Sequence, residues 1–137
     1  MITSKTQFQN GELKILGLGS VAEVDLECAE KEIFYNVFKG VNYNDVNSLE
    51  DTDYVKILFA NILVPFVFVQ FSKNRNAFLA MQGEVTEGAT AYGRTTTSRL
   101  LEVWNNGVSN GKRVFEDNKE VIIESFENCA FIAKLKL

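Results

Sequence analysis

The sequence predicts a small, mainly α-helical domain of three to four helices, with a long loop between the second and third helices and a C-terminal β-strand. Apolar residues recur at a three-to-four spacing in two segments, and a third segment is apolar almost throughout. The last residues instead alternate between two faces, as in a strand. A chain of 137 residues suits one domain, which buries about two-thirds of the surface that its unfolded form exposes. We therefore expect a single domain over 1–137.

Residues 1–19 have no clear period, and we expect an N-terminal arm there. Asn10 and Gly11 both tolerate a positive φ angle, so a hairpin around them is the alternative. The first helix is expected to begin at Ser20, which has the spacing of a capping box with Glu23. Gly40 fits a stop at the C-terminal end of this helix.

The first helix has one apolar stripe and one acidic face. The stripe is expected to pack on a core, and the acidic side chains from Glu23 to Glu32 are expected to face water. Residues 41–53 are rich in asparagine and aspartate, which favours turns, so we expect a polar linker there.

A second helix is expected from about Asp53 to Met81. It is apolar on nearly all sides between Ile57 and Val69, so it is either the central helix of the domain or is partly covered by another subunit. Pro65 is expected to kink it, because proline lacks a backbone donor; a switch to a strand near Pro65 is the alternative. Its apolar stretch without charges is too short to span a bilayer comfortably, so we expect no membrane contact.

Residues 82–97 form a long loop, and connections of this length are usually functional or disordered. Its stretch GATAYGRTTTSRLL differs by one letter from the phosphate-binding pattern G-x-x-x-x-G-K-[ST], because Arg94 replaces the lysine. No buried strand leads into it, and a planar guanidinium does not replace a compact ammonium. We therefore expect no nucleotide and no other cofactor.

Thr97 or Ser98 is expected to cap the third helix, whose apolar face includes Gly107 and Gly111. These two glycines allow close backbone approach, but they also weaken the helix, so a break at Asn-Asn-Gly is the alternative. The type of the segment 119–128 stays open. The terminal strand, 128–137, is expected to pair with the N-terminal Glu-Leu-Lys-Ile-Leu stretch or with another chain.

The composition argues against catalysis and against broad DNA binding. The chain has no histidine, which is the commonest general base and metal ligand. Cys28 and Cys129 lack the spacing of a metal or redox pair, and we expect two buried free thiols. A net charge of −4 disfavours the basic stripe that duplex binding needs. We expect no enzyme and no metal site.

The order of these elements resembles the head–tail connector (adaptor) proteins of tailed bacteriophages. The resemblance covers most of Met1 to Glu116 and includes the initial Met-Ile-Thr, the Ala29-Glu30 pair and Gly40. The third helix begins SRLLEVWNNGVSNGK, as this layout requires. The first helix ends in FYNVFKG, without the proline that is common at this place in that group.

The resemblance implies a structural virion protein, a subunit of an oligomeric ring, often twelve-fold, that joins the portal and capsid to the tail. Its partners would be further copies, the portal protein and a tail or second adaptor protein, with DNA only as passing cargo. It would be located at the head–tail junction of the virion, and its acidic helix face would face solvent or the ring lumen. The loop and terminal segments would contact neighbours, through the candidates Tyr92, Arg94, Arg99, Phe131, Leu135 and Leu137. The alternative is a stand-alone binding module whose Gly/Thr-rich loop engages a peptide or ligand.

Overall fold

The computed structural model describes residues 1–9, 13–15, 23–81 and 96–136, with the side chains of all of these except 78–81. The expected capping residue Ser20, the turn at Asn10 and Gly11, and the loop up to residue 95 lie outside the described residues.

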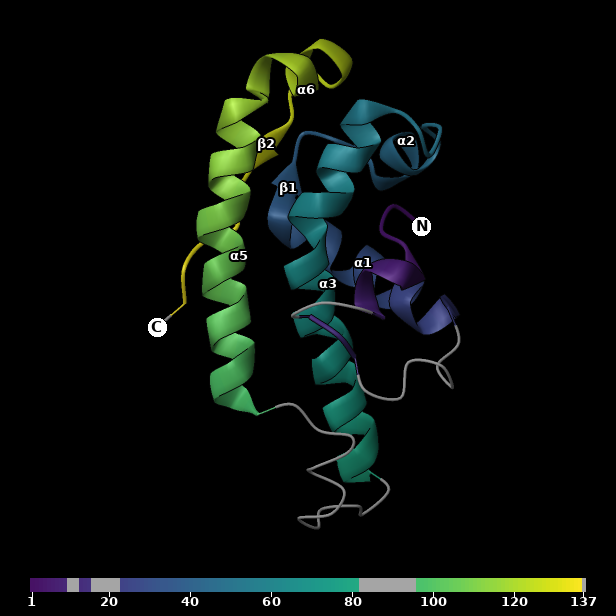
Figure 1. Cartoon of the computed structure of the whole chain (residues 1–137), viewed down its shortest axis with the longest axis vertical. Coiled ribbons are helices and arrows are strands. Elements are labelled where there is room, and N and C mark those ends of the chain that lie inside the picture. Colours follow the sequence, from purple (N-terminus) through teal and green to yellow (C-terminus); the bar gives the residue numbers. More distant parts are fainter. Residues whose placement is uncertain (10–12, 16–22, 82–95, 137) are drawn as a thin grey trace.

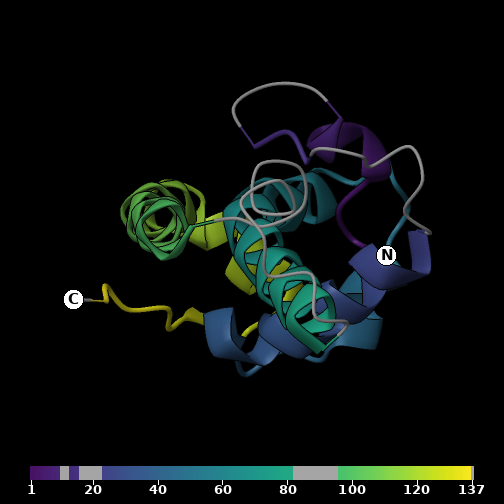
Figure 2. The same cartoon turned by 90° about the horizontal axis from the view of Figure 1, so that it is seen from below.

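The mainly α-helical fold is confirmed. The long helix α3, Tyr54–Met81, lies at the centre, with α1, Glu23–Val37, on one flank and α5, Thr97–Asp117, on the other (Figures 1 and 2). The smaller elements are the 3-10 helix η1 (Lys5–Phe8), helices α2 (Tyr43–Asn47) and α6 (Lys119–Ser125), and strands β1 (Phe38–Lys39) and β2 (Ala130–Phe131).

Helix α3 is the central helix of the domain. It contacts both α1 and α5, and it runs without interruption through Pro65, so the alternative of a strand at that point is wrong. The stretch Tyr54–Ala77 is long and apolar enough to cross a membrane, but 72% of its most apolar window is buried inside the domain. A helix that is apolar on all sides is expected to be buried in this way.

Phenylalanine rings join the three long helices into one core. The ring of Phe38 lies 4.6 Å from that of Phe59 on α3, measured between centroids, and also contacts the rings of Phe34, Phe115 and Phe131. These residues come from α1, α3, α5 and β2, so the rings connect segments that are far apart in the sequence. Aromatic pairs at these distances stabilise the core beyond the area that they bury.

The C-terminal strand pairs with the residues directly after α1. Phe38 is opposite Phe131, and Lys39 is opposite Ala130, in an antiparallel two-stranded sheet. The expected pairing with the N-terminal segment is therefore wrong, and no other chain is needed to pair this strand. The regular strand is also shorter than the expected 128–137.

Gly40 ends this small sheet and not the first helix. Helix α1 stops at Val37, and Gly40 then has a φ angle of +73°. A Cβ atom on Gly40 would lie 1.8 Å from the backbone oxygen of Asn128. Glycine is therefore required here both for the positive φ angle and for the close approach of two backbones.

Two segments that were expected to be irregular are folded onto the domain. Residues 41–53 contain α2, whose N-cap residue Asn42 accepts a hydrogen bond from the backbone N–H of Asn44 at 2.9 Å. In the N-terminal segment, the side chains of Ile2 and Phe8 are buried, so these residues do not form an extended arm.

Helix α5 is continuous across its two glycines, so the alternative of a break at Asn-Asn-Gly is wrong. The expected close approach is confirmed, because a Cβ atom on Gly107 would lie 2.9 Å from the ring of Pro65. A Cβ atom on Gly111 would lie 3.0 Å from the ring of Phe131. The packing against α3 and β2 therefore offsets the low helix propensity of glycine.

The N-cap of α5 is Thr96, and not Thr97 or Ser98 as the sequence indicated. The Thr96 side-chain oxygen accepts a hydrogen bond from the backbone N–H of Arg99 at 3.2 Å. We expect Thr96→Ala to lower the free energy of unfolding by about 1 kcal/mol, because an N–H at the helix start loses its partner. In urea denaturation, Thr97→Ala is the matched control, with a change below about 0.5 kcal/mol. The opposite ranking of the two variants would place the cap at Thr97.

Candidate functional site

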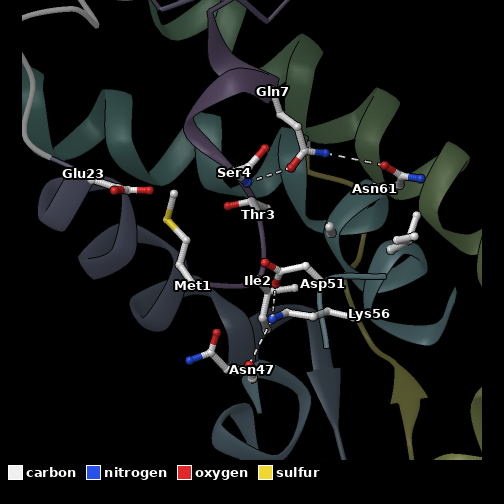
Figure 3. Close-up of a pocket in the computed structure, with 12 residues that line it drawn as sticks. Met1, Ile2, Thr3, Ser4, Gln7, Glu23, Asn47, Asp51, Lys56 and Asn61 are labelled. Atoms are coloured by element: carbon white, nitrogen blue, oxygen red, sulfur yellow. Dashed lines mark hydrogen bonds and ion pairs between the residues drawn. The ribbon is translucent and has the colours of Figure 1, made fainter. Parts of the chain in front are cut away.

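A polar pocket lies between the N-terminal segment and the first turns of α3 (Figure 3). It has a volume of about 650 Å³ and is lined by residues that include Met1, Thr3, Asp51, Lys56 and Asn61. Several segments contribute polar groups to this pocket, so it is a candidate ligand-binding site.

Lys56 lies at the edge of this pocket, and only 6% of its surface is exposed. Its ammonium donates hydrogen bonds to the backbone oxygens of Asn47 and Leu49, at 3.0 and 2.9 Å, and to the Asp51 carboxylate at 2.9 Å. An ammonium has three donors, so all of them are used. The hydrogen bond and the charge of Lys56 lower the pKa of Asp51. Lys56 therefore fixes the end of α2 and has no donor left for a ligand.

Glu30 is fully buried beside the N-terminal segment. Its carboxylate accepts hydrogen bonds from the backbone N–H groups of Ile2 and Thr3, at 2.7 and 2.6 Å, and from the Thr3 hydroxyl at 2.5 Å. A fourth hydrogen bond comes from the hydroxyl of Tyr43. Burial, followed by the hydrogen bond to Glu30, raises the pKa of Tyr43, so this hydroxyl stays protonated and keeps donating.

The burial of Glu30 corrects the expectation that the acidic side chains from Glu23 to Glu32 all face water. Glu30 is four residues after Leu26 and three before Ile33, and both are buried. This spacing puts Glu30 on the apolar stripe of α1. The spacing was visible in the sequence, but the four donors come from other segments, and the pattern of α1 alone could not indicate them.

The structure describes three of the six candidate contact residues, and these three lie on α5, on β2 and after β2. Arg99 lies in the first turn of α5, with its guanidinium 3.6 Å from the Glu102 carboxylate. Phe131 is partly buried, and its ring packs against Gly111, whereas Leu135 has 63% of its surface exposed. The other three candidates, Tyr92, Arg94 and Leu137, lie outside the described residues.

The two cysteines also differ from the expectation of two buried thiols. Cys129 is buried, and this burial raises the pKa of its thiol to about 12. Cys28 is exposed on α1. Cys28 is therefore the cysteine that can react, because the thiolate is the reactive form.

A second cavity, which we call the basic cavity, lies between the C-terminal half of α3 and the first turns of α5. It has a volume of about 360 Å³, and its lining is mostly apolar. Its lining includes Val69, Lys73, Leu100, Leu101, Trp104 and Lys136. No pattern in the sequence indicated this cavity.

The C-terminal segment is held in place at this cavity by α5. The indole N–H of Trp104 donates to the backbone oxygen of Lys134 at 2.7 Å. The Asn105 side chain donates to the backbone oxygen of Lys136 at 2.8 Å and accepts from its N–H at 2.7 Å. The Lys136 ammonium consequently lies 4.0 Å from the centroid of the Trp104 ring, a cation–π contact.

Partial burial and the nearby charge of Lys73 lower the pKa of Lys136. Apolar walls and a neighbouring positive charge both disfavour the charged form of an ammonium group. A ligand with a negatively charged group beside apolar atoms would therefore suit the basic cavity. The lining of the basic cavity has no nucleophile paired with a base. In the part of the chain that the structure describes, no group of three or more acidic or cysteine residues could hold a metal ion.

Together these features define a small, mainly α-helical domain whose buried charged groups hold its own segments in place. Comparisons of the chain with the models of known protein families, with curated proteins and with solved structures found no significant match.

Proposed function

We propose that the protein is a structural subunit of an oligomeric ring, the head–tail connector of a tailed bacteriophage, located between the portal and the tail in the virion. The observation that supports this proposal is the exposure of large apolar side chains on both flanks of one small domain. Val24 and Tyr35 on α1 are 58% and 53% exposed, and Leu135 beyond β2 is 63% exposed. Exposed apolar side chains are candidates for contacts with other chains where they form a contiguous surface.

The position of these surfaces favours a ring over a simple dimer. Val24 and Tyr35 lie on α1, whereas Leu135 lies in the C-terminal segment that α5 holds through Trp104 and Asn105. Helices α1 and α5 lie on two different flanks of α3 (Figures 1 and 2). When two different surfaces of one subunit bind each other, the contacts are heterologous, and they generate a closed ring if the rotation closes. The buried charges are consistent with a structural role, since Glu30 and Lys56 both have hydrogen-bond partners within the chain.

Sedimentation velocity of the purified protein over about a hundredfold range of concentration tests this proposal, because self-association depends on concentration. We expect the weight-average sedimentation coefficient to rise, and electron micrographs of the concentrated sample to show annular particles of one size. A protein that stays monomeric over the whole range would contradict the proposal.

A further inference from the structure

The basic cavity combines two positive charges with apolar walls, in a chain whose net charge is −4. Lys73 of α3 and Lys136 of the C-terminal segment line it together, and both residues are exposed, so a ligand can reach them from solvent. Its volume of about 360 Å³ lies within the range of about 300–1,000 Å³ that is usual for small-molecule sites. The cavity therefore has the size and the access that a small ligand needs.

Lys136 is held in position before any ligand arrives. The Asn105 side chain accepts a hydrogen bond from the Lys136 N–H and donates one to its carbonyl oxygen, which fixes the backbone. The ammonium lies 4.0 Å from the centroid of the Trp104 ring. A lysine side chain loses much conformational entropy when a ligand orders it, and here part of that loss has already occurred on folding.

Lys73 supplies a second positive charge that the fold does not use. Its charge, after the effect of partial burial, lowers the pKa of Lys136, so the two ammonium groups act on each other. Neither lysine is in an ion pair among the residues that the structure describes. Lys56 is different, because all three of its donors bind acceptors of the chain. An anion between Lys73 and Lys136 would relieve their repulsion.

The walls of the basic cavity suit apolar atoms next to that anion. Val69, Leu100 and Trp104 are buried, and Leu101 is partly buried beside them, so it has surface left to cover. A head group alone would contact only the two lysines. An alkyl tail attached to it would remove further apolar surface of the cavity from water, which favours binding.

We infer that the basic cavity binds a small amphiphile with one anionic head group and an alkyl tail, of which a medium-chain fatty acid is the simplest example. The head group lies between the ammonium groups of Lys73 and Lys136, and the tail lies along Leu101 and the Trp104 indole. All of these groups belong to one copy of the chain. The inference therefore goes beyond the proposed ring and does not depend on it.

Titration with octanoate, below the concentration at which it forms micelles, tests this inference on the full chain. Trp104 is the single tryptophan of the chain, so its fluorescence reports on this cavity alone. We expect a saturable change in the fluorescence as the carboxylate approaches the Lys136 ammonium. Isothermal titration calorimetry measures the same dissociation constant if the fluorescence does not respond. Absence of binding in both measurements would overturn the inference.

Three further ligands separate the head group from the tail. Hexanoate, which is two methylene groups shorter, is expected to bind about tenfold more weakly than octanoate. The uncharged 1-octanol is expected to bind at least about tenfold more weakly, because it lacks the charge that the two lysines attract. Acetate should show no binding at the concentrations at which octanoate saturates the site. Equal affinity for octanoate and 1-octanol, or for octanoate and acetate, would contradict an amphiphile site.

Lys73→Gln is expected to raise the dissociation constant of octanoate about tenfold and to leave that of 1-octanol unchanged. Lys134→Gln is the matched control, because it removes the same charge from an exposed lysine of the C-terminal segment that does not line the cavity. We expect it to change the affinity less than about twofold. Equal losses in the two variants would mean that octanoate responds only to the overall charge, and the inference would fail. Sedimentation without octanoate tests the ring separately.

Discussion

Glu30→Gln is expected to lower the free energy of unfolding by about 3–5 kcal/mol, the range observed when one partner of a buried charged network is removed. The carboxylate of Glu30 accepts from two backbone N–H groups and two hydroxyls without contact with water. A glutamine amide presents a donor nitrogen where the carboxylate presents an acceptor oxygen, so at least one of these donors loses its partner. Urea denaturation followed by circular dichroism measures the difference.

Glu32→Gln is the matched control on the same helix. The Glu32 carboxylate also accepts two hydrogen bonds, from the side-chain amides of Gln70 and Asn74, but it is exposed. We expect a change within about 0.5 kcal/mol, because water replaces the lost contacts. Equal effects of the two variants would mean that the Glu30 carboxylate is solvated in solution. A smaller loss for Glu30→Gln with faster proteolysis near Ile2 would show local release of the N-terminal segment without global unfolding.

Gly40→Ala is expected to lower the free energy of unfolding by about 2–5 kcal/mol, from a left-handed backbone in a residue with a Cβ atom and from overpacking. The φ angle of Gly40 is +73°, and the new Cβ atom would meet the backbone oxygen of Asn128 at 1.8 Å. The obstacle is backbone, so a side-chain rotation cannot relieve it. Thermal and urea unfolding of the purified variant provide the measurement.

Lys39→Ala, one residue earlier, is the control for Gly40→Ala. The Lys39 side chain is exposed and the substitution leaves the backbone pairing of β1 with β2 intact, so we expect a change below about 1 kcal/mol. A Gly40→Ala variant as stable as this control would contradict the close approach of Gly40 and Asn128. In that case the pairing of Phe38 with Phe131 would also be in question.

Glu30→Gln and Gly40→Ala change the two sites where the N-terminal and C-terminal parts of the chain contact α1 or the residues directly after it. Glu30 holds the N-terminal residues, and the sheet after α1 holds the residues that lead into the C-terminal segment.

The sequence by itself determined the long helices. Apolar residues on nearly all sides from Ile57 to Val69 predicted a buried helix, and α3 confirms it. The small side chains of Gly107 and Gly111 correctly indicated close packing on one face of α5. These features are local, because the period of apolar residues and the size of a side chain can be read within a few turns of one helix.

Only the tertiary structure decided what each polar group and each short strand contacts. The pairing of Phe38 with Phe131, the four donors to Glu30, and the use of Lys56 at the end of α2 all join residues from separate elements. The basic cavity likewise forms only where α3, α5 and the C-terminal segment meet. Such contacts depend on how the elements pack against one another, and a buried polar group takes whichever partner that packing brings within reach.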